Sequence, residues 1–232
     1  MARLSRLTDP HAGDWVNERL LDDHNLAGVP VGSIVPTGFP RVVRVFHPAG
    51  TKTWAQIAAA NDRTMHPLAQ WCGICPDYDG TSRNGDDDPE EGSMPQDVQA
   101  AVFDHLPGDD VVYAVWVGWG SWTELELPDV VMPGSHGREY ALFTGPKGVV
   151  TTWPGMQEAL PQSASLVWPL DRAWCLATDI DWDSTLVAAD DAVVEGLLAD
   201  DRLETFEVAY LDDLSWPGDR VNPAASGLPR PI

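Results

Sequence analysis

The stretch from Trp168 to Val187 has the clearest alternation of apolar and polar positions in the chain. From Ala173 onward, large apolar side chains alternate with side chains that are first small and then acidic. Because successive side chains of a β-strand point to opposite faces, this period predicts a strand over 173–183 with one face on the core. Its acidic end should emerge at the rim of a sheet, where carboxylates stay hydrated. The apolar positions are Trp174, Leu176, Thr178, Ile180 and Trp182, and the acidic ones are Asp179, Asp181 and Asp183.

Four other apolar segments have the composition of strands. One of them, Val111 to Val117, is apolar at almost every position, which predicts a central strand buried on both faces. The predicted strands besides 173–183 are 41–46, 111–117, 139–144 and 203–209. The residues we expect in the core are Val115, Leu142, Trp174, Leu176, Ile180 and Leu197.

Helix-start signals precede three segments with a helical period. Thr53 is a suitable N-cap for a helix to Asn61, and Asp190 is one for a helix over 191–199. Ser93 followed by Gln96 has the spacing of a capping box, and Pro107-Gly108 ends the helix that it begins.

These strands and helices do not alternate regularly along the chain. Such an order predicts one α+β domain over 1–232, with a mixed, largely antiparallel sheet and two to four helices. The segment 77–92 is rich in acids, Gly and Pro, which is typical of a solvated loop. An irregular tail is expected over 212–232.

The formal net charge is −22, and only Lys52 and Lys147 are lysines among the 14 basic residues. This charge disfavours binding to a nucleic acid backbone or an anionic membrane, because both depend on Lys and Arg contacts. It favours a basic protein partner, although a generally acidic proteome explains it equally simply. No apolar run approaches the length of a membrane span, and three cysteines do not form a disulfide framework. We therefore expect a cytoplasmic protein.

Eleven tryptophans are several times the usual share. Trp116, Trp119 and Trp122 follow one another closely near the end of a predicted strand, where they either form a recognition surface or anchor a loop to the core. With Asp179 they are the binding residues that the sequence offers.

The segment from Asp181 to Thr185 has the D-x-D-x-T spacing of the haloacid-dehalogenase-type phosphohydrolases. That chemistry needs Mg²⁺ and a downstream Lys, and no Lys follows Lys147. The same acids lack the Gly of an EF-hand calcium loop. The weak catalytic candidates that remain are Asp181, Asp183 and His136.

Cys72 and Cys75 have the C-x-x-C spacing of a zinc knuckle or a redox pair. Tetrahedral zinc needs four ligands, and His66 is the nearest further candidate in the sequence. Because no second pair completes the set, we expect free thiols, no bound metal and no cofactor.

Several short segments are similar to one group of proteins. They are Val35-Pro36-Thr37-Gly38-Phe39, Ala114-Val115-Trp116, Gly118-Trp119-Gly120, Asp171-Arg172-Ala173-Trp174 and Asp181-Trp182-Asp183-Ser184-Thr185. Together they resemble hypothetical proteins of actinobacteria and their phages, over roughly 30–210. No activity is assigned to that group, so the resemblance implies no functional residue.

Two functions remain open. The first is a non-enzymatic interaction protein that offers an acidic, Trp-edged face to a partner, as an inhibitor, an immunity-like protein or an assembly subunit. The second is a hydrolase that uses the carboxylates of Asp181 and Asp183. An enzyme predicts that the acids converge in a cleft, whereas an acidic docking face predicts that they spread over the surface.

Overall fold

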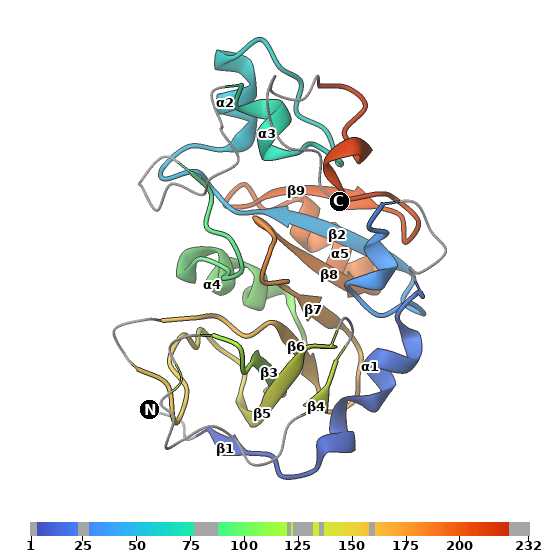
Figure 1. Cartoon of the computed structure of the whole chain (residues 1–232), viewed down its shortest axis with the longest axis vertical. Coiled ribbons are helices and arrows are strands. Elements are labelled where there is room, and N and C mark those ends of the chain that lie inside the picture. The colour runs from blue at the N-terminus through green and yellow to red at the C-terminus, as the bar shows by residue number, and fades with distance from the viewer. Residues whose placement is uncertain are drawn as a thin grey trace.

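The structure, a computed structural model, describes residues 4–22, 28–76, 88–119, 122, 132–134, 137–157 and 161–222. In these residues nine strands form one sheet in the order β1-β5-β3-β6-β7-β8-β2-β9, with β4 also paired to β5 (Figure 1). Each of the pairings is antiparallel. The predicted α+β class is therefore confirmed, and the five α-helices of this part exceed the expected range by one.

The strands are β1 (Ser5–Arg6), β2 (Arg41–Phe46), β3 (Asp110–Trp116), β4 (Met132–Pro133), β5 (Glu139–Pro146), β6 (Leu166–Pro169), β7 (Cys175–Ala177), β8 (Ser184–Ala189) and β9 (Glu204–Val208). The α-helices are α1 (Asp14–Arg19), α2 (Trp54–Ala60), α3 (Trp71–Ile74), α4 (Gln96–His105) and α5 (Asp191–Leu198). Short 3₁₀ turns include η2 (Val31–Ser33) and η4 (Trp216–Gly218).

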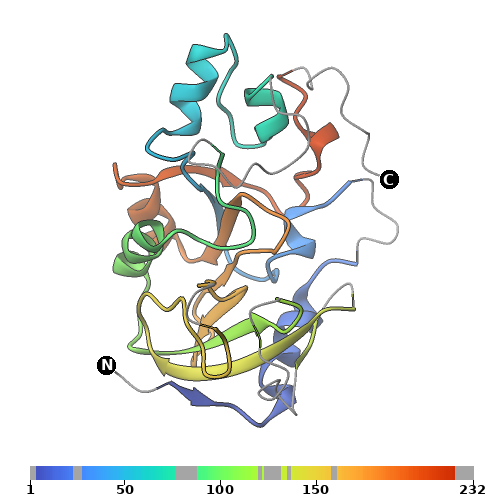
Figure 2. The same cartoon turned by 60° about the vertical axis from the view of Figure 1, so that its left-hand side comes forward.

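Helices cover both faces of the sheet. Figure 2 shows α4 and α5 on one side and α1 on the other. Alternate residues of β3 divide between the two cores, since Val111, Tyr113 and Val115 face α4 and α5 while Val112 and Ala114 face α1. This confirms that β3 is a central strand buried on both faces.

A third, smaller core lies beside the last two strands of the sheet, β2 and β9. There α2 and α3 pack on Phe46 through Trp54, Trp71 and Ile74, and Figure 1 shows both helices standing apart from the main layers. The ring centroids of Phe46 and Trp54 are 4.7 Å apart, and those of Trp54 and Trp71 are 5.2 Å apart. These tilted ring contacts position α3 over the end of the sheet.

The predicted strand over 173–183 is wrong in its second half. β7 ends at Ala177, a tight turn follows, and β8 begins at Ser184. The turn forms because the Asp179 carboxylate accepts a hydrogen bond from the Asp181 backbone N–H (3.2 Å) while the Asp179 carbonyl accepts one from Trp182 (3.1 Å). An Asp side chain bonded to its own backbone competes with a sheet ladder in this way.

Because the strand ends at Ala177, the side chains after it no longer alternate between the two faces of the sheet. Trp174 and Leu176 are buried as expected, and so are Val115, Leu142 and Leu197. Ile180 is only half-buried, because it lies in the turn. Gly92, from another segment, holds the turn: its N–H donates to the Trp182 carbonyl (2.8 Å). Gly92 has a φ of +73°, and a Cβ there would approach the Ile180 oxygen to 2.5 Å.

Two of the three predicted caps form. The side chains of Thr53 and Gln56 make a reciprocal capping box on α2, and Asp190 caps α5 through the Val193 N–H (3.0 Å). Ser93 does not cap α4, whose N-cap is Pro95. The Ser93 hydroxyl instead accepts a hydrogen bond from the Ser163 N–H at 3.0 Å. The hydroxyl that the local spacing predicts as a helix cap therefore bonds to a distant loop.

The described part of the tail, 212–222, contains the short turn η4, and Leu214 is buried. The loop residues 77–87 and the tail residues 223–232 lie outside the described part. Among the helices that the structure describes, none is long and apolar enough to cross a membrane.

Candidate functional site

A cleft of about 370 Å³ lies where segments from six parts of the chain meet. Its walls come from η2 and its neighbours, from α3 with the preceding Gln70, from the turn between β7 and β8, and from the segment that leads into η4. Glu91 and Arg138 complete the lining. Figure 1 shows α3 and η4 near each other at one end of the molecule, although they are far apart in sequence. The volume lies within the range of small-ligand sites.

Three acids predicted at the strand end line this cleft together. Asp179, Asp181 and Asp183 all contribute to its wall, and Glu91 is a fourth carboxylate. The turn brings the three Asp residues to one site, since in a continuous strand they would have followed one another along one face over a longer distance. The sequence named these acids, but it expected them at the end of a continuous strand and not in a turn that lines a cleft.

Arg138 neutralises two of the four acids. Its Nη1 pairs with Asp179, and its Nη2 donates to the Asp181 carboxylate at 2.8 Å. The side chains of Arg138 and Asp179 are 17% and 18% exposed, whereas that of Asp181 is 71% exposed. Arg138 therefore fixes the turn on its buried side and leaves Asp181 at the mouth of the cleft.

Behind the cleft, Arg44 occupies an interior position of β2 and has no solvent exposure. Its Nε donates to the Ser184 hydroxyl (2.9 Å), and its Nη1 donates to the carbonyls of Pro67 and Ala69 (3.2 and 2.9 Å). Its Nη2 lies 3.7 Å from the Oδ1 of Asp183. Burial lowers the pKa of Arg44 to about 10, so the guanidinium stays charged at neutral pH.

Two carboxyls of the cleft, those of the half-buried Asp183 and the exposed Glu91, are harder to ionise than usual. Burial raises the pKa of Asp183, although the Arg44 guanidinium opposes that shift. Burial also raises the pKa of Glu91, and the negative charges of Asp183, Asp181 and Asp88 raise it further. Burial is the main cause of both shifts, and only for Glu91 do neighbouring negative charges add to it.

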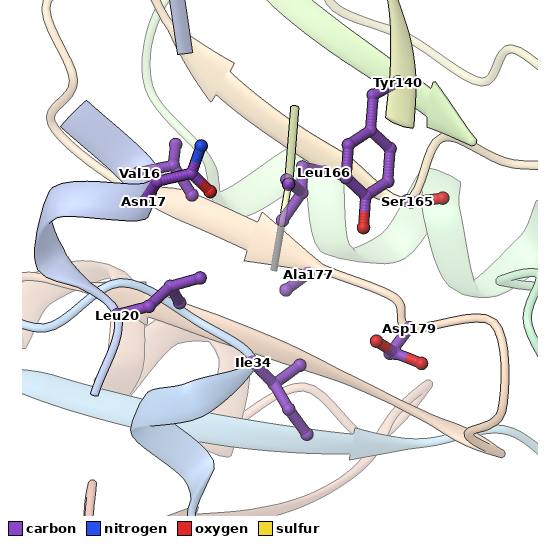
Figure 3. A pocket seen from close by; sticks show the side chains of 10 residues that line it. Val16, Asn17, Leu20, Ile34, Tyr140, Ser165, Leu166, Ala177 and Asp179 are labelled. Atoms are coloured by element: carbon purple, nitrogen blue, oxygen red, sulfur yellow. The ribbon is translucent and has the colours of Figure 1, made fainter. Parts of the chain in front are cut away.

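A second, much smaller cavity of about 20 Å³ shares Ile34 and Asp179 with the cleft. Figure 3 shows the side chains of Tyr140, Ser165 and Asp179 around it. The Ser165 hydroxyl oxygen is buried without a hydrogen-bond partner among the described residues. Burial raises the pKa of Tyr140 to about 12, which keeps its hydroxyl protonated. This cavity is large enough for a single water molecule.

The cysteine and histidine candidates do not form a metal site. Cys72 lines the cleft and is 2% exposed, and burial raises its pKa to about 11, so it is a thiol at neutral pH. Cys75 is half-buried, and neither cysteine forms a disulfide. His66 is paired with Asp219 at 2.9 Å. Across the described residues, no group of three or more His, Cys, Asp or Glu side chains is placed to hold a metal ion.

None of the three Trp residues of the predicted binding surface lines the cleft. The Trp116 and Trp119 rings meet edge to face at 5.4 Å, and the Trp122 indole N–H donates to the Trp116 carbonyl (2.9 Å). Trp122 is only 7% exposed and belongs to the core, so its ring offers little surface to a partner. His136 lies outside the described residues.

The sequence did not single out the aromatic walls or the cations of the cleft. The walls are Trp71, Trp182 and Trp216, from three distant segments. Arg44 did carry a signal, because an Arg inside an apolar strand segment is rarely buried without a charged partner. Nothing in the local sequence connects Arg138 or Glu91 to the turn at 179–183.

No protein-family model, no curated protein and no solved structure matches this chain significantly. The function is therefore argued from the charges and walls of the cleft.

Proposed function

We propose that this chain is an interaction protein that receives a positively charged group of its partner in the cleft. One observation supports this above the others: four carboxylates line the cleft, while Arg138 and Arg44 supply two positive charges, so two negative charges remain in excess. The net charge of the whole chain acts in the same direction, because it attracts basic partners over longer distances.

The raised pKa values of Glu91 and Asp183 fit this role. A cation that enters the cleft stabilises the ionised form of both carboxyls, so binding and ionisation support each other. In the free protein the same charges repel one another and are partly desolvated. The site is therefore built to gain more from a cation than an exposed carboxylate pair would.

The test is binding of a Lys-rich peptide to the full chain, followed by calorimetry at two salt concentrations. We expect Glu91→Gln and Asp183→Asn to weaken binding about 10-fold each, since a charge-assisted contact contributes about 1.5–3 kcal/mol. Asp110→Asn is the matched control, because it removes one negative charge at an exposed position outside the cleft lining.

The control should change binding less than about 2-fold, which corresponds to the weak influence of a distant, screened charge. Equal losses in all three variants would contradict the proposal, because they would mean that only the overall charge matters. Absence of any binding at low salt would contradict it as well.

A hydrolase is the second candidate, and the convergence of four acids in one cleft favours it, since that is the arrangement expected of an enzyme. Glu91 and Asp183, both with raised pKa values, share a cleft with the more exposed Asp181. General acid–base catalysis uses a carboxyl with a raised pKa that lies beside a second carboxyl. A substrate screen in which Glu91→Gln and Asp183→Asn abolish a hydrolysis that Asp110→Asn retains would favour the enzyme.

A further inference from the structure

The aromatic walls of the cleft narrow the kind of cation that fits it. Trp71 lies on α3, Trp182 in the turn between β7 and β8, and Trp216 at the start of η4, and all three line the same space. The Trp71 indole N–H donates to the Asp88 carboxylate (3.2 Å), which fixes that ring. Val29, Ile34 and Leu214 add aliphatic surface. The cation therefore meets apolar and aromatic groups over much of the wall.

The carboxylates of the cleft already have partners for much of their hydrogen-bonding capacity. Arg138 pairs with Asp179 and Asp181, and the other oxygen of Asp179 accepts the Asp181 backbone N–H. Arg44 lies against one oxygen of Asp183. The negative field remains, while the aromatic and aliphatic walls offer no acceptor to those N–H groups of a primary ammonium or a guanidinium that turn toward them.

A cation without N–H donors avoids this difficulty. An alkylated ammonium spreads its charge over methyl groups, loses little hydration and is attracted by the faces of Trp rings. It needs a negative field and apolar walls, and the cleft supplies both. Its compact size also suits a volume of about 370 Å³.

Resting on the function proposed above, we propose that the cation which this cleft recognises is a quaternary or otherwise alkylated ammonium group, held between Trp182, Trp216 and the acids. The group reaches the cleft either on a small molecule or on a methylated lysine of a partner protein. The chemistry is the same for both sources.

The experiment titrates the full chain with three small probes of similar shape and measures dissociation constants by calorimetry and Trp fluorescence. Choline carries the quaternary ammonium, ethanolamine carries a primary one, and 3,3-dimethyl-1-butanol has a carbon in place of the nitrogen. We expect choline to bind about 10-fold more tightly than ethanolamine, within the range of a desolvated cation–π contact. The neutral alcohol should bind at least as weakly as ethanolamine.

Variants of the walls provide the second arm. Trp216→Leu and Trp182→Leu should each weaken choline binding about 10-fold, and Trp116→Leu, a half-buried Trp outside the cleft lining, should leave it within about 2-fold. Thermal unfolding identifies any variant that fails to fold. The comparison of the three probes uses the wild-type chain, so it tests the proposal even if a variant fails to fold.

The source of the group is tested with one Lys peptide in unmodified and trimethylated form. Tighter binding of the trimethylated peptide than of choline assigns the site to a modified protein, and the reverse assigns it to a small molecule. If ethanolamine or the unmodified peptide binds as tightly as its methylated counterpart, the inference fails and the proposed function stands. If the neutral alcohol matches choline, or if no cation binds, both fail.

Discussion

The Nη2 of Arg44 lies 3.7 Å from the Oδ1 of Asp183, and this contact links an interior position of β2 to the floor of the cleft. Asp183 has an exposed side-chain fraction of 15%, and Arg44 has none. Since Arg44 is also held by two carbonyls and a hydroxyl, its geometry is fixed before any ligand arrives. The acid is thereby oriented by a group that a ligand cannot touch.

Replacement of Arg44 by Met should lower the free energy of unfolding by about 3–5 kcal/mol, because it leaves Asp183 without its buried partner. Arg41→Met, at the start of the same strand, is the matched control. Its ion pair with Glu207 is half exposed and screened by water, so its loss should cost far less. Urea unfolding measures both values, and equal losses would contradict a special role for Arg44.

His47 should make the chain less stable in acid. Its Nδ1 donates to the Glu90 carbonyl (2.6 Å) and its Nε2 accepts from the Thr185 hydroxyl (2.9 Å), so the ring is held neutral. Burial lowers the pKa of His47 from 6.5 to about 4. Its contribution is therefore complete above pH 6.5 and is lost as pH falls through 4, by about 3 kcal/mol in total.

The measurement is urea unfolding between pH 7 and pH 4, with His47→Gln as the control. The raised pKa values of Asp183 and Glu91 act in the opposite direction, since their contribution is present at low pH and is lost as pH rises through their folded values. The difference between the wild type and His47→Gln isolates the histidine. If the two proteins lose stability in parallel, His47 is not responsible.

Asp219 should hold the segment that forms one wall of the cleft. It accepts hydrogen bonds from the backbone N–H groups of Gln70, Val221 and Asn222, and from the His66 ring. Burial opposes its ionisation, but these bonds lower its pKa below the ordinary value. Asp219→Asn should cost about 1–3 kcal/mol, because an amide leaves buried donors without an acceptor.

Hydrogen exchange checks this prediction, because it shows which segments lose protection in Asp219→Asn. Protection should fall in the residues that Asp219 joins, around 66–74 and 219–222, while β3 and β5 stay protected. The control is Asp212→Asn, because Asp212 accepts a single exposed hydrogen bond from the Ala209 N–H. A uniform loss of protection throughout the sheet would show that Asp219 stabilises the fold as a whole.

Removal of the Arg138 charge should strengthen cation binding. Arg138→Gln leaves four acids opposite one remaining guanidinium, so the affinity for the Lys-rich peptide should rise about 3- to 10-fold. Arg202→Gln is the control, since Arg202 pairs with Asp200 and Asp104 outside the cleft lining. Weaker binding to Arg138→Gln at an unchanged melting temperature would instead indicate that Arg138 itself holds the ligand.

The sequence predicted those helix ends whose capping interactions join residues close together in the chain. The Thr53 box and the Asp190 cap form as expected because both ends of each interaction lie within one helical turn. The central strand was predictable because β3 is buried on both faces. The prediction at Ser93 was wrong because its hydroxyl bonds to Ser163, seventy residues away, which no local spacing reveals.

The same distinction explains the site. Asp179, Asp181 and Asp183 could be named from the sequence because they are consecutive alternate residues. Their convergence could not, since it depends on a turn that the apparent period concealed and on Gly92 fixing that turn from another segment. Arg138 and the three Trp walls belong to the cleft only through tertiary packing.

The pairing of β2 also bears on how the protein is made. β2 ends at residue 46, but its partners β8 and β9 begin at residues 184 and 204. On a ribosome, β2 has no strand partner and Arg44 lacks Asp183 and Ser184 until residues 183–208 have emerged, while β3, β5 and β6 can already join as neighbours. Such long-range pairing is slow and leaves strand edges open to aggregation. The cleft, with walls from Val29 to Trp216, is complete only after Trp216 has emerged, so a shorter nascent chain lacks one of its walls.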